Sequence, residues 1–352
     1  MAYASEQQHG NDLRHRGCLS DAAKTEAVTS SVAAGELSQK QPLGMQLATL
    51  LVIVVPLLGI IAVPFLVWGW GFYWLDLILL VSMYLLTALG ITVGYHRLFT
   101  HRSFETYMCL KAILAILGSM ALEGPLLKWV AMHRRHHQHS DTPLDPHTPH
   151  HHGSGFWRLL KGVWHAHMGW LFLPEPAGWQ DYVRDLYKST TLRWISKLFP
   201  IWAVLGLALP ALIGGLVQGN WQGAATGFVW GGLVRVFLVH HVTWSVNSAC
   251  HLWGWQPFRT DDESRDNPVF GVLALGEGWH ASHHAFPTSA RHGLRWWQLD
   301  VSYYLIRFLS WLHLAWNIRL PTQERIASTL KSAVHQQQAN TGEEAAKRIN
   351  TH

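Results

Sequence analysis

Histidine is concentrated in short motifs of this 352-residue chain, which contains 24 histidines but only three cysteines. Nine histidines fall in four motifs: His96-Arg-Leu-Phe-Thr-His101, His133-Arg-Arg-His136-His137, Asn247-Ser-Ala-Cys-His251 and His280-Ala-Ser-His283-His284. Residues three and four apart share one face of a helix, so the last three motifs present convergent nitrogen and oxygen atoms. The five-residue spacing of His96 and His101 fits an ordinary helix less well and predicts a helix end or a π-type turn.

The chemistry of imidazole makes these motifs candidates for a redox metal centre. Imidazole binds first-row transition metals, and nine histidines divide into two sites of four or five ligands, each with a position open for dioxygen or water. Nitrogen ligands without thiolates favour iron over structural zinc, and motifs nearly free of carboxylates differ from ferritin-like di-iron sites. Packing at an interface would not require four such motifs, so we predict metal binding.

Eleven of the other fifteen histidines receive more ordinary interpretations. A Pro- and Gly-rich loop contains four that we expect to be solvated rather than to bind metal: His147, His150, His151 and His152. Hydrogen bonding near the ligands, rather than ligation, is expected for His139, His165 and His167. His240 and His241 precede the third motif and are expected to orient it. His292 and His313 are interpreted as structural.

The composition makes a wholly soluble protein improbable, because 49% of the residues are apolar and only 14% are charged. Four apolar runs can each cross ~30 Å of hydrocarbon as about 20 helical residues. These predicted crossings are residues 47–70, 72–95, 198–217 and 223–246. The last run contains Arg235, so its later part is expected to lie outside the hydrocarbon or to face protein.

The positions of the basic residues predict how the chain is oriented. The formal net charge is +5, yet the short turns around 70–72 and 218–223 contain no lysine or arginine. Under the positive-inside rule both termini and the central segment are cytoplasmic, so a further apolar run over 107–122 cannot span the membrane. Topology then accounts for the positive charge, which argues against a nucleic-acid partner.

Together these patterns predict an all-α integral membrane protein. Four transmembrane helices form two hairpins, and a cytoplasmic helical cap carries the histidine-rich site. Residues 1–44 are interpreted as a disordered cytoplasmic tail, residues 45–320 as the membrane domain, and residues 321–352 as a polar C-terminal tail.

The order of the motifs, with two crossings between the second and the third, resembles the membrane-bound fatty acid desaturases, in particular the Δ9 acyl-CoA (stearoyl-CoA) desaturase type. The resemblance covers residues 45–320 and is carried by five stretches. They are Gly94 to Phe104, Trp129 to His137, Asp141 to Pro146, Thr243 to His251, and Gly276 to Pro287. The element from Asn247 to His251 distinguishes this pattern from membrane alkane and lipid hydroxylases, which share the other histidine boxes.

The resemblance implies a di-iron centre that uses dioxygen to introduce a cis double bond into a saturated acyl chain. The implied metal-contacting residues are Asn247, through water, and the motif histidines His96, His101, His133, His136, His137, His251, His280, His283 and His284. A bent acyl tunnel beside the metals is also implied, with Trp129, Thr243 and Trp244 in its wall. Glu123 occupies a tunnel position at which many relatives carry an uncharged amide.

The resemblance further implies an acyl-CoA or acyl-lipid substrate and a separate electron donor, either a ferredoxin or a reductase. Three scattered cysteines exclude an iron–sulfur cluster within the chain. The plain polar tails indicate a bacterial inner-membrane protein. Two alternatives stay open, namely a di-iron lipid or alkane hydroxylase and a metal transporter. Transport is disfavoured because the runs over 47–70 and 198–217 contain no ionisable residue.

Overall fold

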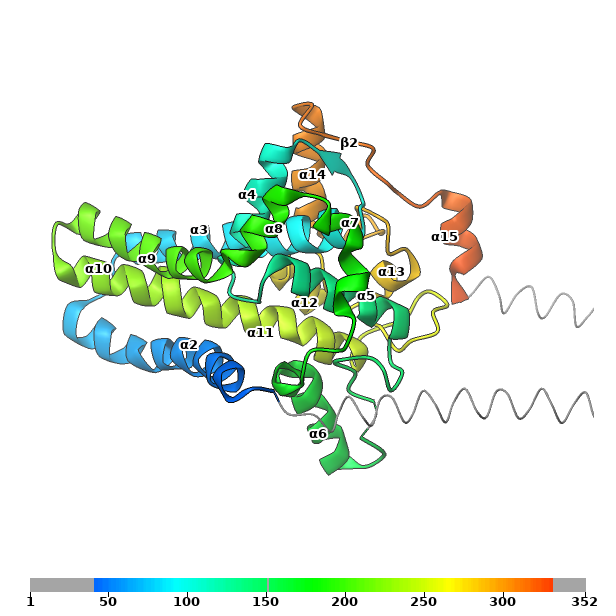
Figure 1. Cartoon of the computed structure of the whole chain (residues 1–352), viewed down its shortest axis with the longest axis horizontal. Coiled ribbons are helices and arrows are strands. Elements are labelled where there is room, and N and C mark those ends of the chain that lie inside the picture. Colours follow the sequence, from blue (N-terminus) through cyan, green and yellow to red (C-terminus); the bar gives the residue numbers. More distant parts are fainter. Residues whose placement is uncertain (1–40, 151, 332–352) are drawn as a thin grey trace, which may run out of the picture.

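The computed structural model of the chain describes residues 41–150 and 152–331 (Figure 1). The predicted N-terminal tail up to residue 40, His151, and the predicted C-terminal tail from residue 332 lie outside the described residues. Helices dominate, in the order α2 (Leu43–Trp70), α3 (Trp74–Leu89), η1 (Gly90–Thr100), α4 (Met108–Ser119), α5 (Leu126–His139), α6 (Phe156–His167), η2 (Gly169–Phe172), η3 (Trp179–Val183), α7 (Arg184–Tyr187), α8 (Thr190–Lys197), α9 (Phe199–Gln218), α10 (Trp221–Gly227), η4 (Phe228–Val234), α11 (Arg235–Ser248), η5 (Ala249–His251), α12 (Pro268–Leu273), α13 (His280–Ala285), α14 (Val301–Trp311) and α15 (Gln323–Thr329).

Two short strands also occur in the described residues. β1 (Glu105–Thr106) pairs antiparallel with β2 (Ala315–Trp316), with Glu105 opposite Trp316. The fold is therefore mostly helical rather than strictly all-α. The strand pair joins the segment after η1 to the segment after α14.

Four helical segments are long and apolar enough to cross a membrane, and each overlaps one of the predicted crossings. They are Leu43–Trp70, Trp74–Thr100, Phe199–Gln218 and Trp221–His251. Helix α4, which lies in the apolar run over 107–122, has 12 residues and is only ~18 Å long. That length falls well short of the ~30 Å of a bilayer core, in agreement with the expectation that this run does not span.

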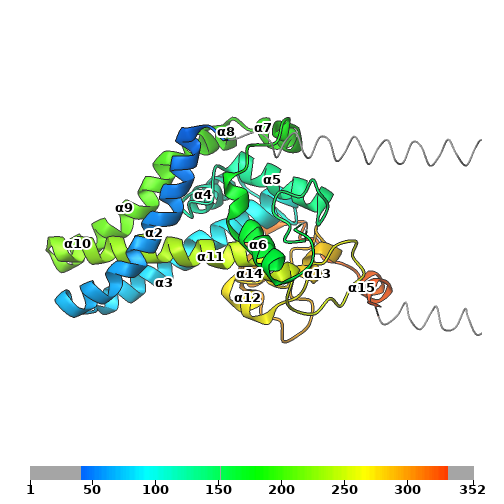
Figure 2. The ribbon, with the colours of Figure 1, turned by 90° about the horizontal axis from the view of Figure 1, so that it is seen from below.

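The four long segments pack together and the shorter helices gather at one of their ends (Figures 1 and 2). Close backbone approaches allow this packing. A Cβ atom added at Gly90 would lie 2.2 Å from the backbone nitrogen of Gly118, so only glycine lets the start of η1 touch α4. A Cβ atom at Gly214 would likewise meet the carbonyl oxygen of Gly223, where α9 contacts α10.

A buried cation connects three parts of this bundle. Arg235 is fully buried and donates from Nη1 to the carbonyl of Met120 at 2.7 Å. Its Nη2 donates to the carbonyl of Gly206 at 2.6 Å, and its Nε donates to the carbonyl of Gly231 at 3.1 Å. Backbone carbonyls thus supply the acceptors that a cation needs away from water, and Arg235 faces protein, as the sequence predicts.

The second long segment ends in a π-helix, which places the first histidine motif. Residues Gly90–Thr100 form η1, and the backbone N–H of His101 donates to the carbonyl of His96 at 3.1 Å. A bond between residues five apart is the defining contact of a π-type turn. It brings the rings of His96 and His101 to a centroid distance of 4.8 Å, so the interpretation of their five-residue spacing is confirmed.

Candidate metal centre

The nine motif histidines form two groups where the long segments meet the shorter helices. In each group the side-chain nitrogens lie within 4.8 Å of one another. The first group contains His96, His101, His133, His137 and His283, and the second contains His136, His251, His280 and His284. The structure thus brings together all nine predicted histidines, divided into five and four.

The first group is built from η1, α5 and α13. His133 and His137 are one turn apart on α5, and their Nε2 atoms are 3.1 Å apart. The Nε2 of His283, from α13, lies 2.8 Å from Nε2 of His137 and 3.1 Å from Nε2 of His96. All of these rings turn the same nitrogen toward one point.

The second group is built from α5, η5 and α13. The Nε2 atoms of His251 and His280 are 3.0 Å apart, and those of His136 and His284 are 3.4 Å apart. His136 and His137 are neighbours on α5, and His283 and His284 are neighbours on α13. Because adjacent helical residues point about 100° apart, each of these helices supplies ligands to both groups.

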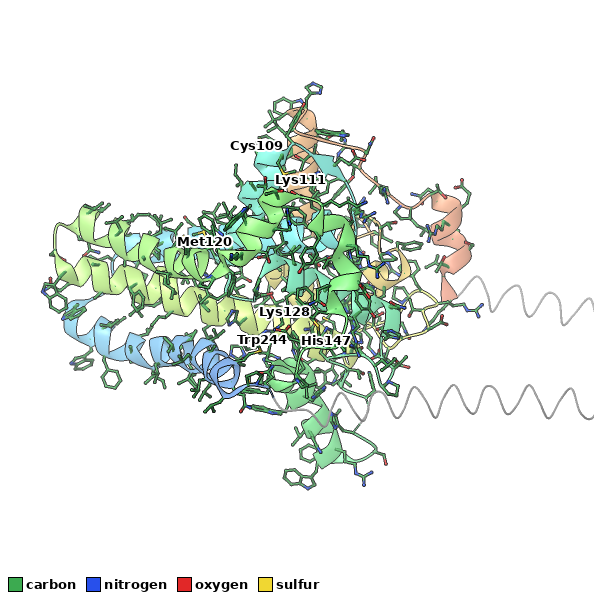
Figure 3. All side chains as sticks on the ribbon, in the orientation of Figure 1. Cys109, Lys111, Met120, Lys128, His147 and Trp244 are labelled. Atoms are coloured by element: carbon green, nitrogen blue, oxygen red, sulfur yellow. The ribbon has the colours of Figure 1, made fainter. Side chains whose placement is uncertain are left out.

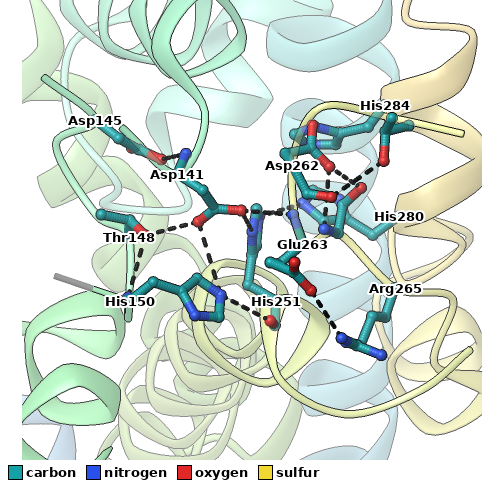
Figure 4. A network of polar contacts seen from close by, with 12 residues as sticks. Asp141, Asp145, Thr148, His150, His251, Asp262, Glu263, Arg265, His280 and His284 are labelled. Atoms are coloured by element: carbon teal, nitrogen blue, oxygen red, sulfur yellow. Dashed lines mark hydrogen bonds and ion pairs between the residues drawn. The ribbon is translucent and has the colours of Figure 1, made fainter. Parts of the chain in front are cut away.

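Carboxylates hold the outer nitrogens of three of the four histidines in the second group, and Figure 4 shows this for His251 and His284. The Nδ1 of His136 lies 3.0 Å from Asp145, that of His251 lies 3.0 Å from Asp141, and that of His284 lies 2.6 Å from Asp262. In the first group, Nδ1 of His96 contacts Glu277. An imidazole that donates its Nδ1 proton to a carboxylate presents an Nε2 lone pair on its other side, as metal-binding histidines do.

Burial disfavours protonation of these rings, so their buried ring nitrogens need a partner other than a proton. Burial is the main reason why the pKa of five histidines falls well below its usual value: His101, His133, His137, His280 and His283. These rings are neutral at pH 7, and each neutral imidazole has a single N–H donor. Among the described residues, Nε2 of His101 and Nδ1 of His280 and His283 are buried without a partner. Clustered lone pairs at such short separations fit a metal cation in each group.

The prediction that the histidines of the loop after α5 are solvated is wrong for His147. His147 was expected to be solvated but is only 4% exposed, with its ring 4.3 Å from that of His136. Its backbone N–H donates to Asp145 at 3.1 Å, and His150 lies 3.1 Å from the carbonyl of His251. Asp145 and Asp141 bind the second group and so fold the loop onto it. His152 contacts the ring of His165, and His151 lies outside the described residues.

The remaining histidines differ in how they approach the two groups. His292 is buried with its ring 4.4 Å from that of His283, so it packs directly against the first group. His167 hydrogen bonds to Ser248 at 3.1 Å and to His241 at 2.9 Å, beside the third motif. His240 instead donates to the carbonyl of Ala121 at 3.0 Å, so it holds the turn after α4 rather than the third motif.

A cavity of about 360 Å³ adjoins both groups. Its wall includes every residue predicted to line a tunnel, namely Trp129, Thr243, Trp244 and Glu123. Asn247 also lines this cavity. His96 and His133 of the first group and His280 of the second reach the same cavity, so a molecule within it would lie against both groups.

A family model described as fatty acid desaturase matches residues 73–307, which contain the whole of both histidine groups. The chain belongs to the fatty acid desaturase family. This desaturase is 42% identical over 275 residues to a hex-5-enoyl-[acyl-carrier protein] acetylenase of Moorena producens, covering 78% of this chain and 86% of that protein. It is 38% identical over 259 residues to an sn-1 stearoyl-lipid 9-desaturase of Anabaena variabilis, covering 72% and 88% respectively.

A third relative is the chloroplastic palmitoyl-monogalactosyldiacylglycerol delta-7 desaturase of Arabidopsis thaliana, 38% identical over 267 residues. That alignment covers 73% of this chain and 67% of the plant protein. The names of the three relatives differ in acyl carrier and in double-bond position. Membership of the family makes this chain a membrane-bound oxidoreductase of acyl groups. It does not define the acyl carrier or the position of the double bond.

Glu123 gives the cavity of this desaturase an ionisable wall. The indole N–H of Trp129 donates to its Oε2 at 3.1 Å, while Oε1 is buried without a partner among the described residues. Burial raises the pKa of Glu123 to about 7, and the neighbouring Thr243 and Trp129 oppose this rise by a smaller amount. Near neutral pH the carboxyl is therefore divided between its protonated and ionised forms.

Proposed function

We propose that this desaturase introduces a cis double bond at the Δ9 position of a saturated acyl chain, using two iron ions, dioxygen and an external electron donor. The observation that carries the proposal is the apolar cavity that runs against both histidine groups. A saturated chain has no polar group near its middle, so its position must be set by the shape of the cavity that holds it.

The two histidine groups would hold the irons. One iron would be bound by His96, His101, His133, His137 and His283, and the other by His136, His251, His280 and His284, with Asn247 acting through water. When bound, iron supplies the activation of dioxygen that removal of hydrogen from an unactivated methylene requires. Carboxylates on the outer nitrogens orient the rings, and burial of the groups excludes water that would divert the reaction.

The cavity wall would choose the reacting carbons and the cis geometry. Trp129 stacks on His133 with a ring separation of 5.1 Å, so the position of its indole relative to the first group is set. Trp244, on helix α11, stacks on His240 with a ring separation of 4.9 Å. A bend between these two rigid aromatic side chains would accommodate an acyl chain that is bent at the reacting carbons, as in a cis product.

We place the active site on the cytoplasmic side of a bacterial inner membrane, with both termini in the cytoplasm. The distribution of basic residues supports this orientation. Electrons would come from a separate ferredoxin or reductase that reaches the same side. The chain has only three cysteines, two of which are described, and these two are unpaired.

Expression in a desaturase-deficient bacterial host tests the proposal. We expect new monounsaturated fatty acids whose double bond, located by derivatisation and mass spectrometry, lies between carbons 9 and 10 in the cis form. An olefin at another position would contradict the Δ9 assignment alone. A hydroxylated chain without an olefin, or an unchanged fatty acid profile with a working electron donor, would contradict the proposed reaction.

Removing the carboxylate behind His136 should weaken metal binding. Asp145→Asn keeps the shape of the side chain but removes the charge, and loss of such an outer partner typically lowers metal affinity ~10–100-fold. The purified variant should contain less iron than the parent and should recover activity when ferrous iron is added. Asp181→Asn, at an exposed carboxylate paired with Arg184, is the control. Equal iron content in the two variants would contradict the role assigned to Asp145.

The ionisation of Glu123 should make acyl binding depend on pH. As pH rises through about 7 the carboxyl loses its proton, and an apolar chain then binds beside a charge. If only the protonated form binds, the apparent KM should be about tenfold higher at pH 8 than at pH 6. Glu123→Gln should flatten this dependence while retaining activity. A KM that rises equally in the parent and in the variant would exclude Glu123 as the titrating group.

A further inference from the structure

The opening of the acyl cavity is bordered by residues of two membrane helices and one connecting segment. Its rim includes Ala48 and Thr49 on α2 and Phe199 at the start of α9, all within candidate membrane spans. Ala48 is exposed, so the cavity reaches the surface of α2. The segment from Trp170 to Pro176 completes the rim. Because α2 and α9 would be surrounded by lipid, this opening lies at the edge of the bilayer.

The rim on this side is held together by hydrogen bonds. Gln41, two residues before the start of α2, is 6% exposed and donates to the carbonyl of Leu171 at 2.9 Å. Its amide also contacts the carbonyl of Leu173. The start of the first membrane helix is thus tied to the segment that borders the cavity. A molecule that enters here passes between a lipid-facing helix and a loop attached to it.

The charges at the cavity do not suit a carrier rich in phosphate. Two residues of the cavity wall, as far as the chain is described, are lysine or arginine: Lys128 and Arg135. Lys128 Nζ lies 2.6 Å from Glu175 Oε1, with both side chains about one-third exposed. Arg135 is 8% exposed and donates from Nε to the carbonyl of Leu144 at 3.1 Å. Both cations already have acceptors, and Glu175 would repel an anion that approached the opening.

In the view of Figure 3, Lys128, Trp244 and His147 all lie in the region where the long helices meet the shorter ones. All three residues line the same cavity. The compensated ion pair of Lys128 and Glu175 therefore belongs to the wall of the cavity that would hold the acyl donor. Coenzyme A brings several phosphate charges to such a place, and proteins normally bind phosphate with free lysine or arginine side chains.

We propose that the acyl donor of this enzyme is a membrane glycerolipid, whose saturated chain enters the cavity from the bilayer between α2, the start of α9 and the 170–176 segment. This inference rests on the proposed function and specifies its substrate class. Glu175 is a specificity-determining residue in this arrangement, because it neutralises Lys128 and disfavours a polyanionic head group.

The test uses the full-length, iron-loaded enzyme in vesicles of 1-stearoyl-2-oleoyl phosphatidylethanolamine with labelled stearate, alongside labelled stearoyl-CoA as a competing donor. An electron donor system and dioxygen are supplied to both, and no acyltransferase is present. We expect labelled oleate in the glycerolipid. Turnover of stearoyl-CoA should be at least about tenfold lower, because charges at the opening of a site can change the encounter rate of a charged substrate by that factor. Desaturation of stearoyl-CoA at an equal or higher rate would overturn the inference and leave the desaturase function intact. Desaturation of neither donor would also overturn the inference, and the olefin test in the expressing host then decides the desaturase function separately.

A charge-reversal variant separates the role of Glu175 from a general defect. Glu175→Lys places two free cations at the opening and should raise kcat/KM for stearoyl-CoA by about tenfold, with the gain disappearing at high salt. Asp181→Lys is the matched control, at another exposed carboxylate that is paired with Arg184 and does not line the cavity. An equal response of the two variants would show that the opening does not select against the charge of the head group.

Discussion

Replacing His136 with alanine is expected to abolish desaturation. The ring is 1% exposed, its Nδ1 is held by Asp145, and its Nε2 faces His284 in the four-membered group. Loss of an outer carboxylate alone costs ~10–100-fold, so removal of a ligand should reduce olefin formation by more than ~100-fold. Fatty acid analysis of the expressing host measures the olefin, and metal analysis of the purified protein should show less iron than in the parent.

His313→Asn is the matched control for this prediction. His313 is exposed, belongs to neither group, and has a positive φ of 57° that asparagine tolerates. The control variant should desaturate like the parent. If His136→Ala were made at parental levels in the membrane and still produced the olefin, the second group would not be a site that the reaction requires.

Replacing Ala88 with phenylalanine should change the chain length that the enzyme accepts. Ala88 is buried in the cavity wall eight residues before His96, or ~12 Å along the helix. Nearby, the Tyr84 hydroxyl donates to the carbonyl of Leu273 at 2.6 Å and joins α3 to α12. The part of the acyl chain beyond the reacting carbons would lie here. A benzyl group at residue 88 would occupy the space of the last few carbons.

The expected shift is large, because a single methylene in an apolar pocket is worth ~10–200-fold in specificity. Relative kcat/KM for an 18-carbon chain against a 14-carbon chain should fall at least tenfold in the variant, by the same reasoning. Leu85→Phe, which enlarges a residue on the exposed face of the same helix, should leave the ratio unchanged. An unaltered ratio in Ala88→Phe would mean that the chain ends elsewhere.

Much of the scaffold could be predicted because its physical constraints are local. A bilayer requires about 20 apolar residues for each crossing, and a 12-residue helix such as α4 cannot meet that requirement. The ends of the crossings were less accurate, because η1 continues the second helix to Thr100, beyond the predicted limit at residue 95. Apolarity does not define that end, since the π-helix is stabilised by contacts with α4 and α5 that come later in the chain.

The candidate site likewise has a part that local spacing predicts and a part that it does not. Spacing along a helix brought the histidines of α5 and α13 together in the prediction, since residues three and four apart share a face. The carboxylates Asp141, Asp145, Asp262 and Glu277 were missed as partners of the histidines, because loops carry them to the rings. His147 was misplaced for the same reason, since composition predicts that a segment is a loop but not which surface the loop covers.

The buried guanidinium of Arg235 has a consequence for how the chain is made. A lone arginine is costly in the middle of a bilayer, so α11 is unsuited to reside there by itself. Its acceptors on Met120 and Gly206 lie earlier in the sequence and leave the ribosome first. Both acceptors are therefore already synthesised when the last crossing emerges, so Arg235 does not depend on a later part of the chain for these two hydrogen bonds.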